Sequence, residues 1–352
     1  MTSGDFGRSI ALAALVAALS ACTSSNATLP HSSLAGEAGR SVRVSQFADL
    51  PGPPAYYFPT AITVGPDHAI WVTDDIDQDF GESAVARINS TGRRTATYYF
   101  QNSASPSFED LAAGSDGALW ISDWADGQIV RMTMTGTFTT FSLDGGGPLG
   151  VIAGPDRAIW FVENFFGSAA IGRISTNGRI ASYSNGISRG AALQDIAVGP
   201  DGALWFTEST GDRIGRITTR GKIKEYSAGI SPGAEPYSIA PGSDGALWFT
   251  EMAGGRIGRI TTKGVVTEFS RGITPSEQPV GIAKGRGGMW FTEYEGSYGS
   301  EGARVARISP SGKIVEYSGL TPNAGPSSVV RGPDGNMWFV ESNADRFARI
   351  SI

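Results

Sequence analysis

Short apolar runs separated by turn residues fill the chain from about residue 42 onwards. Each repeat of the pattern has four such runs. Residues 238–240 are an example of the first run, and residues 204–207, 214–217 and 223–227 are examples of the second, third and fourth. Glycine and proline recur between the runs too often for helices of about ten residues or more. The pattern therefore predicts an all-β domain built from short strands.

Tryptophan marks a repeat of this pattern, because seven of the eight Trp residues stand in a similar sequence frame. These residues recur at intervals of 40 to 49 positions: Trp71, Trp120, Trp160, Trp205, Trp248, Trp290 and Trp338. Four short strands in each unit of about 40 to 50 residues are typical of the blades of a β-propeller. A solenoid or an open array of repeats is the competing interpretation.

The two ends of the chain complement each other. The last unit stops after its third strand, at residues 346–350, whereas residues 42–47 resemble a fourth strand that has no unit of its own. Pairing these segments would close a ring and remove an exposed sheet edge. The sequence thus predicts a seven-bladed β-propeller over residues 42–352, with four-stranded blades and an N-terminal strand (about 42–47) that completes the last blade.

Charged residues recur in fixed register with the tryptophans. In a propeller the first strand of each blade lines the central channel, so its start and the end of the second strand share one face, which we call the mouth. Three residues after each Trp, near the mouth, stands a carboxylate: Asp74, Asp123, Glu163, Glu208, Glu251, Glu293 and Glu341. The third strands carry an equally regular arginine: Arg87, Arg131, Arg173, Arg216, Arg259, Arg307 and Arg349.

This register is most simply explained by ion pairs between the mouth carboxylates and the arginines. Two or three of the acids are instead expected to have a functional role. The Asp residues on the opposite face, such as Asp116, Asp201 and Asp244, are expected to be ordinary turn formers.

Function is expected where the repeats differ from one another. The residue that opens each first strand varies: Thr60, Glu109, Leu149, Gln194, Tyr237, Val280 and Ser327. The residue after each mouth carboxylate varies too: Asp75, Trp124, Asn164, Ser209, Met252, Tyr294 and Ser342. Of these, Glu109 and Gln194 are polar candidates for ligand binding at the mouth.

Aromatic residues near the mouth are further candidates for ligand binding. Trp124 is the one Trp outside the repeat position, and Tyr294, Tyr57 and Phe58 fall near the same face. Together they are expected to form an aromatic wall on which a ligand stacks. Packing of these rings within the loops is the alternative.

Two mouth loops are longer than their counterparts and rich in acids. The loop after Trp71 carries Asp74, Asp75, Asp77, Asp79 and Glu82, and the loop after Trp290 carries Glu293, Glu295 and Glu301. Alternating carboxylates can supply oxygen ligands for calcium. However, Phe80 occupies the position where an EF-hand-like loop needs glycine, so a solvated acidic loop is the alternative.

The N-terminal segment predicts export. Residues 9–21 form an apolar run that is too short to span a membrane and indicates a signal peptide over residues 1–21. The segment Leu19-Ser-Ala-Cys22 resembles the bacterial lipobox, which implies cleavage before Cys22 and acylation of that residue. An ordinary secretion signal is the alternative.

The predicted mature chain begins with an anchor and a tether. Residues 22–41 comprise Cys22 and a stretch rich in Ser, Ala and Gly, which predicts a flexible tether. We therefore expect a lipoprotein of the cell envelope that contacts the lipid bilayer through its acyl chains. By resemblance to Gram-negative lipoproteins, Thr23 in place of Asp favours the outer membrane if the source is Gram-negative.

The overall charge excludes one class of partner. The chain has 28 basic and 34 acidic residues, a formal net charge of −6, which offers nucleic acid no attraction.

Cys22 is the single cysteine, so internal disulfides are excluded.

The repeated frame resembles a known family. Residues 199–208 read Gly-Pro-Asp-Gly-Ala-Leu-Trp-Phe-Thr-Glu, and Ile-Gly-Arg-Ile follows at residues 214–217. This frame resembles the virginiamycin B lyase (streptogramin lyase) family over about residues 42–352. The resemblance implies a seven-bladed propeller that linearises a cyclic depsipeptide antibiotic by elimination, with a magnesium ion and a catalytic histidine.

The resemblance fails at the expected histidine. The family carries it in a Glu-Pro-His element at a first-strand opening, where this chain reads Glu235-Pro-Tyr237. The histidines of the chain are His31, in the predicted tether, and His68, in an opposite-face turn. Tyr237 and Glu235 are therefore the catalytic candidates, although Tyr237 would need a lowered pKa to act as a base.

Two functions from different classes remain. In the first, the propeller is a binding module that holds a small molecule or a protein at its mouth. In the second, it is a metal-dependent lyase or hydrolase acting on a cyclic ester or peptide. In that case Glu251 and Glu293, which match the second-strand frame of the family, are the candidate ligands for Mg or Ca.

Overall fold

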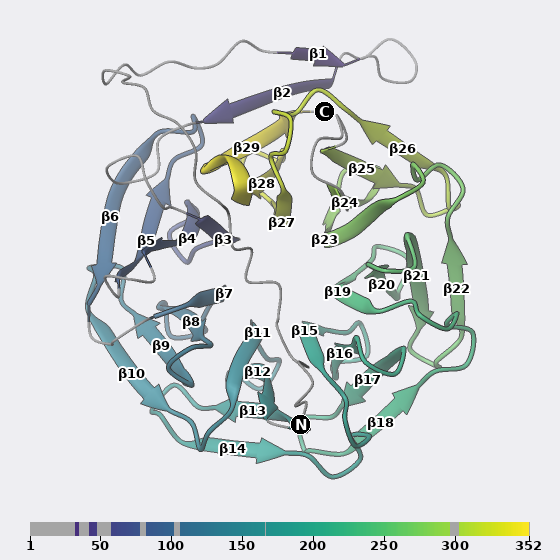
Figure 1. The fold of residues 1–352 in the computed structure, drawn as a ribbon. Coiled ribbons are helices and arrows are strands. Elements are labelled where there is room, and N and C mark those ends of the chain that lie inside the picture. The colour runs from purple at the N-terminus through teal and green to yellow at the C-terminus, as the bar shows by residue number, and fades with distance from the viewer. Residues whose placement is uncertain are drawn as a thin grey trace, which may run out of the picture.

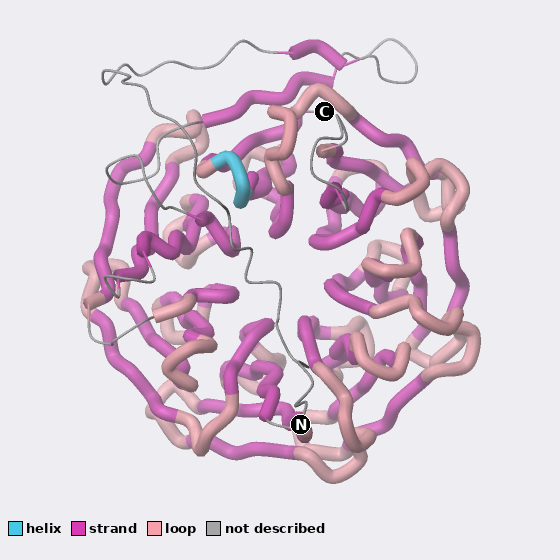
Figure 2. The backbone as a smooth tube through the Cα atoms, in the orientation of Figure 1, coloured by secondary structure: helices cyan, strands magenta, loops and turns pink. Residues whose placement is uncertain are grey.

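Seven β-sheets arranged around a central axis form the computed structural model of the chain (Figure 1). The structure describes residues 32–34, 42–47, 58–77, 82–101, 106–165, 167–295 and 303–351. Within these residues the one helical element is a short 3₁₀ turn, η2 (Ser342–Ala344) (Figure 2). No helix of the described residues is long and apolar enough to span a membrane. The predicted seven-bladed β-propeller is confirmed, and the solenoid interpretation is wrong.

Each blade is an antiparallel sheet whose first strand lies nearest the axis, and blades are numbered here in chain order. Blade 1 contains β3 (Phe58–Val64), β4 (Ile70–Asp77), β5 (Glu82–Ile88) and β6 (Arg94–Phe100). Blade 2 contains β7 (Phe108–Ala113), β8 (Leu119–Asp123), β9 (Gln128–Met132) and β10 (Phe138–Ser142). Blade 3 contains β11 (Gly147–Ala153), β12 (Ile159–Phe165), β13 (Ser168–Ile174) and β14 (Ile180–Tyr183).

The remaining blades repeat this arrangement. Blade 4 contains β15 (Leu193–Val198), β16 (Leu204–Glu208), β17 (Arg213–Ile217) and β18 (Ile223–Tyr226). Blade 5 contains β19 (Pro236–Pro241), β20 (Ala246–Glu251), β21 (Arg256–Thr261) and β22 (Val266–Phe269). Blade 6 contains β23 (Glu277–Gly285), β24 (Gly288–Glu295), β25 (Arg304–Ile308) and β26 (Ile314–Tyr317). Blade 7 contains β27 (Pro326–Arg331), β28 (Met337–Glu341) and β29 (Arg346–Ser351), followed by β2 (Val42–Phe47).

The ring closes through its two ends, as predicted. Strand β2 pairs antiparallel with β29, in a register that places Val44 opposite Ile350 and Phe47 opposite Phe347. A further short strand, β1 (Ser32–Leu34), pairs with β2 and gives the last sheet five strands (Figure 1). This strand falls within the segment for which the sequence predicted a tether. It covers backbone groups of β2 that would otherwise form an open edge.

The hydrophobic core lies between neighbouring blades. Each repeat Trp is buried and stacks on an aromatic ring; the centroids of Trp205 and Tyr226 are 5.4 Å apart. Side chains of the adjoining blade complete each cluster, so that Trp205 packs in one core with Leu247 and Phe249. Packing of this kind fixes the positions of the seven first strands around the axis.

The predicted pairing of the repeat arginines with the mouth carboxylates is wrong. In blade 4, Arg216 donates from Nε to Oδ2 of the turn residue Asp201 at 2.7 Å, and Trp205 donates from Nε1 to Oδ1 at 3.0 Å. Trp205 and Arg216 are cross-strand partners on one face of the sheet, whereas Glu208, three residues after Trp205, lies on the other.

The turn Asp residues are therefore more than turn formers. Six blades have an Arg–Asp pair of this kind, with Asp67, Asp116, Asp156, Asp201, Asp244 and Asp334. Against the effect of burial, hydrogen bonds from Trp205 and Arg216 hold the pKa of Asp201 below its usual value. Blade 6 differs, because Arg286 takes the place of the Asp.

Candidate functional site

A β-bulge in every first strand shapes the mouth of the channel. In β19, Pro236 pairs with Glu251 and Ile239 pairs with Phe249, so two residues oppose one. The other six blades show a register shift at the same point. A bulge bends its strand and re-aims a side chain. The residues that opened the first strands in the sequence pattern lie within these bulges.

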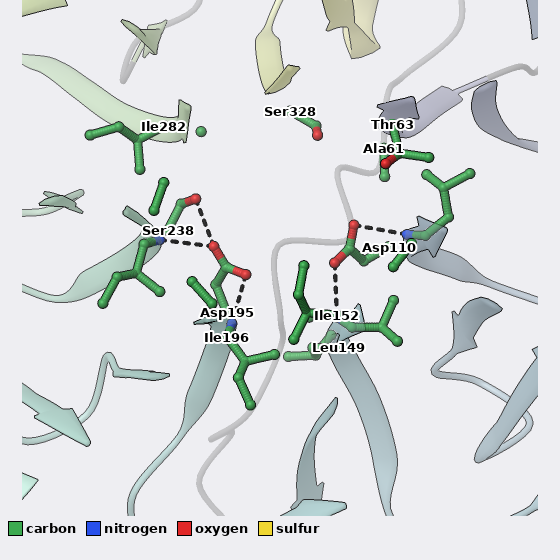
Figure 3. A pocket seen from close by; sticks show the side chains of 18 of the residues that line it. Ala61, Thr63, Asp110, Leu149, Ile152, Asp195, Ile196, Ser238, Ile282 and Ser328 are labelled. Atoms are coloured by element: carbon green, nitrogen blue, oxygen red, sulfur yellow. Dashed lines mark hydrogen bonds between the residues drawn. The ribbon is translucent and has the colours of Figure 1, made fainter. Parts of the chain in front are cut away.

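The seven bulge residues line one central cavity of about 540 Å³ (Figure 3). They are the variable residues identified from the sequence: Thr60, Glu109, Leu149, Gln194, Tyr237, Val280 and Ser327. The structure therefore brings Glu109, Gln194 and Tyr237 together from blades 2, 4 and 5. The expectation that the variable first-strand residues share one site agrees with this arrangement.

Asp195 lines the cavity and joins two blades. Its Oδ1 accepts a hydrogen bond from the backbone N–H of Ile196 at 2.7 Å. Its Oδ2 accepts from the N–H of Ile239 and from Oγ of Ser238, both in blade 5 and both at 2.8 Å (Figure 3). Burial raises the pKa of Asp195, although these hydrogen bonds oppose the rise.

Asp110 also lines the cavity, and it joins blades 2 and 3. It accepts hydrogen bonds from the N–H groups of Leu111 and Val151, each at 2.8 Å (Figure 3). Burial and the nearby charge of Asp195 raise its pKa to about 8. Sequence reasoning missed both aspartates. The signal was present, because each directly follows a variable residue of the first strand.

Two polar bulge residues, Tyr237 and Glu109, have raised pKa values, which favour their protonated forms. Burial and the neighbouring Glu109 and Asp195 raise the pKa of Tyr237 to about 12, so its hydroxyl is a donor at neutral pH. Burial also raises the pKa of Glu109, whose Oε1 accepts a hydrogen bond from Oγ of Ser107 at 3.1 Å. A base must lose its proton readily. The Tyr237 hydroxyl is thus shifted away from the lowered pKa that catalysis would need.

Glu235 does not share this cavity. It lies exposed in the loop before β19, with a left-handed backbone (φ 51°), and its N–H donates to Oδ1 of Asp212 at 3.0 Å. Glu235 is absent from the residues that line the cavity, whereas Tyr237 is among them. The two catalytic candidates therefore do not share one site, because Tyr237 lines the cavity and Glu235 lies in the exposed loop before β19.

The two described members of the predicted aromatic wall lie in blades 2 and 6, which do not adjoin, and their role in ligand binding stays a prediction. Trp124 lies at the mouth side of blade 2 and is 43% exposed. Tyr294 belongs to blade 6, where its hydroxyl lies 3.5 Å from Nδ2 of Asn343. Blades 2 and 6 face each other across the ring (Figure 1). Tyr57 lies outside the described residues, as does the side chain of Phe58.

Gln194 has a partner in its own blade. Its Nε2 donates to Oγ of Ser209 at 3.2 Å, and Ser209 follows the mouth carboxylate Glu208. The two sets of variable residues found in the sequence, those that open first strands and those that follow mouth carboxylates, therefore meet at this point. Gln194 is also among the residues that line the cavity.

The seven mouth carboxylates are buried where the first and second strands meet, as predicted. Four of them face an arginine at the start of the third strand, in blades 4 to 7: Arg213, Arg256, Arg304 and Arg346. In blade 5, Arg256 donates from Nε to Oε2 of Glu251 at 2.9 Å. The sequence analysis did not single out these arginines, and their contacts differ: Arg213 lies 3.9 Å from Glu208, Arg304 donates to Glu277, and Glu341 accepts instead from Gln46.

The candidate metal ligands do not form one centre. Glu251 and Glu293 belong to different blades, and each lies beside its own arginine. Burial, with Glu316 and Glu277 nearby, raises the pKa of Glu293 to about 9, so this group is uncharged at neutral pH. The described residues contain no group of three His, Cys, Asp or Glu side chains suited to a metal ion. These two residues therefore do not fit a shared Mg or Ca site.

The two acidic loops at the mouth lie largely outside the described residues. In the loop after Trp71, the side chains from Asp75 to Gly81 are outside the described residues, as are those of Glu295 and Glu301 in the loop after Trp290. The calcium hypothesis for these loops stays a prediction.

The histidines give the mouth no imidazole within the described part of the chain. His68 occupies the turn between β3 and β4, on the face opposite the mouth, with a left-handed backbone (φ 58°). Its N–H donates to the carbonyl of Gly65 at 3.0 Å, which fits the turn role inferred from the sequence. His31 lies outside the described residues.

Fold and site together define a seven-bladed β-propeller with a central cavity along its first strands, mostly apolar and with polar bulge residues at its mouth end. The sequence model of the virginiamycin B lyase family matches residues 46–299, and the chain belongs to this family. A streptogramin B lyase structure is 30% identical, with a TM-score of 0.75, and covers 88% of this chain and 97% of its own. Virginiamycin B lyase from Staphylococcus aureus is 31% identical, with a TM-score of 0.76, over 88% of this chain and 99% of its own.

One related structure contains a ligand. It is a catalytically inactive histidine-to-alanine variant of the Staphylococcus aureus enzyme with quinupristin, 31% identical with a TM-score of 0.76. No curated protein sequence matched the chain.

Proposed function

We propose that the protein is an exported, lipid-anchored binding protein that holds a cyclic peptide-like ligand at the mouth of its propeller and leaves the ligand ring intact. One observation carries this proposal: the cavity-lining bulges supply hydrogen-bonding groups from Glu109, Gln194 and Tyr237 but no imidazole. A shaped cavity with a few convergent polar groups is what a small-molecule site requires. Elimination needs a base that accepts a proton, whereas binding does not, so the absence of an imidazole favours binding without elimination.

Family membership supports the choice of ligand class. The inactive relative with quinupristin lost its activity through replacement of a histidine, yet its structure contains this ligand. The present chain has no histidine among the described residues of the mouth. Binding without turnover is therefore the behaviour that this cavity supports best.

Incubation of the full chain with quinupristin tests the proposal. Elimination opens the ring without changing the mass, and hydrolysis adds one water, so chromatography and mass spectrometry together distinguish the products. We expect titration calorimetry to detect binding and chromatography to recover the intact ring. Linear product, or no binding at all, would contradict the proposal.

Two variants localise the binding. Gln194→Ala removes a cavity-lining amide and should weaken quinupristin binding about tenfold, because a buried hydrogen bond is lost. Tyr99→Ala, on the exposed outer strand of blade 1, is the matched control and should bind like the wild type. Equal effects of the two substitutions would place the ligand elsewhere.

A second candidate function has one observation in its favour. Glu109 lines the cavity at the position where the family places its histidine in another blade, and burial raises its pKa toward the range of a general base. If linear quinupristin does form, we propose that Glu109 accepts the proton. Glu109→Gln should then abolish the product while quinupristin still binds.

The anchor is testable separately. If Cys22 carries the acyl chains, the protein produced in bacteria should sediment with membranes, and Cys22→Ser should release it into the soluble fraction. Membrane association that survives the substitution would contradict the lipoprotein assignment.

A further inference from the structure

An exposed indole lies where blades 2 and 3 meet, beside the start of the strand that leads to the cavity. Trp124 follows β8 and leans on Gly147, the first residue of β11; a Cβ atom on Gly147 would stand only 2.4 Å from Nε1 of Trp124. Two residues further on, Leu149 lines the central cavity (Figure 3). A large aromatic side chain with 43% of its surface exposed therefore lies against a residue two positions from the cavity lining.

A buried carboxylate adjoins the same segment. A Cβ atom on Gly146 would lie 2.9 Å from the Phe165 ring and 3.3 Å from Oε2 of Glu163, so consecutive glycines lie beside this ring, the carboxylate and the Trp124 indole. Glu163 is 3% exposed and accepts no hydrogen bond from the described residues. Burial and the neighbouring charge of Asp144 raise its pKa to about 7. A buried carboxylate without a partner is costly and favours a cation beside it.

The sister blades show which group is missing. In blades 4 to 7 the residue paired with the mouth carboxylate is an arginine, and in blade 2 it is Gln128, which donates to Asp123 at 2.8 Å. In blade 1 the residue paired with Asp74 is Ala84, and in blade 3 the residue paired with Glu163 is Ala170. The outer-strand position that holds Glu225 in blade 4 is Ser182 in blade 3. Blade 3 thus keeps the acid and lacks the guanidinium.

We infer that the rim between blades 2 and 3 binds a cationic group of the mouth ligand, a guanidinium or an alkylammonium, between the Trp124 indole and the Glu163 carboxylate. A guanidinium pairs with carboxylates and stacks on aromatic faces, which are the two surfaces present here. Asp144 adds negative charge beside them. This inference rests on the proposed function, because it names the chemistry of one part of that ligand.

Two matched probes test the charge requirement on the full chain. Arginine amide carries a guanidinium, and citrulline amide has a neutral ureido group of the same shape. At about pH 8, where Glu163 is ionised, calorimetry should show binding of arginine amide and at least about tenfold weaker binding of citrulline amide. Equal affinity for the two amides would overturn the inference.

Substitutions locate the site. Glu163→Gln should weaken arginine amide binding about tenfold, whereas Glu208→Gln, in a blade that has its own arginine, should leave it unchanged. Trp124→Phe should weaken it less, because a phenyl ring keeps part of the cation–π attraction. Ala170→Arg would place in blade 3 the guanidinium that blades 4 to 7 carry. It should abolish binding and raise the melting temperature.

The outcomes separate this inference from the proposed function. If Glu163→Gln and Ala170→Arg both bind arginine amide like the wild type, the rim assignment is wrong, even where quinupristin still binds at the mouth. If arginine amide binds as described but quinupristin does not bind or is linearised, the proposed function fails and the cation site stands.

Discussion

Carboxyl groups in this propeller differ in charge according to the sheet face on which they lie. Burial and the nearby Glu225 raise the pKa of Glu208 to about 8. Against the effect of burial, hydrogen bonds from the indole and the guanidinium hold the pKa of Asp201, in the same blade, below its usual value. The spacing from Trp205 decides between these environments, because successive residues of a strand alternate between its faces.

The Tyr237 hydroxyl gives a test of the cavity environment. Its pKa of about 12 means that it should keep its proton where exposed tyrosines ionise. The ultraviolet absorbance of phenolate, followed up to about pH 11, should therefore be the same in the wild type and in Tyr237→Phe. A titrating phenol that disappears from the variant at lower pH would show that Tyr237 is available as a base.

The candidate site was predictable from the sequence only in part. The repeat exposes variable residues such as Gln194, and the period places them at one end of the channel. The partners of the charged residues were not predictable, because Arg216 and Glu208 are close in sequence but lie on opposite faces of one sheet. Trp124 and Tyr294 belong to the second and sixth of seven repeats, so the predicted ring itself places them on different sides of the axis.

At the scale of the element, the loops that enter blades 4 to 7 are each fixed by a side-chain hydrogen bond to the fourth strand of the blade. Oγ of Ser188 donates to Oε2 of Glu225 in β18 at 2.6 Å, and Ser231 contacts Glu268 in β22 in the same way. In blade 7 the outer strand is β2, and its residue Gln46 donates from Nε2 to Oγ1 of Thr321 at 3.0 Å. The N-terminal strand thus supplies a side-chain contact as well as backbone pairing.

The Trp–Asp–Arg contact stabilises six of the seven blades, and substitutions can remove it or introduce it in the seventh. Asp201→Ala loses hydrogen bonds to Trp205 and Arg216 and should lower the free energy of unfolding by about 1–2 kcal/mol. Arg286→Asp introduces the missing carboxylate in blade 6, beside Arg307. It should raise stability by up to about 1 kcal/mol in denaturant titrations. A loss of stability in both variants would contradict this role.

At the scale of the molecule, closure of the ring followed from the sequence. The regular Trp spacing and the unmatched strands at the two ends determined the number of blades and the pairing of β2 with β29. Strand β1 was not predictable, because Ser32–Leu34 is short and lies in a segment without apolar periodicity. Such a strand forms because an edge is available for pairing, which is a property of the folded ring.

The buried carboxyls predict that stability falls as pH rises. Glu208 and Glu293 have folded pKa values of about 8 and about 9, above the ordinary value of 4.5. The folded state therefore keeps protons that the unfolded chain has lost, and this contribution is full below pH 4.5 and is lost as pH rises through the folded values. The turn aspartates, whose pKa values are lowered, add stability above pH 3.8 and lose it in stronger acid.

The melting temperature should accordingly be highest near about pH 5 and decrease toward about pH 9. Glu293→Gln removes one of the groups responsible and should make the decrease shallower. Calorimetry across this range provides the measurement. A melting temperature that increases from about pH 5 to about pH 8 would show that the mouth carboxyls are ionised in the folded protein.

The structure of the full chain determined experimentally with quinupristin tests the central claim most directly. We expect the ligand, with its ring closed, in the cavity bordered by Glu109, Gln194 and Tyr237. A linearised ligand in that cavity, or a ligand bound on the opposite face or on the outer strands, would contradict the account.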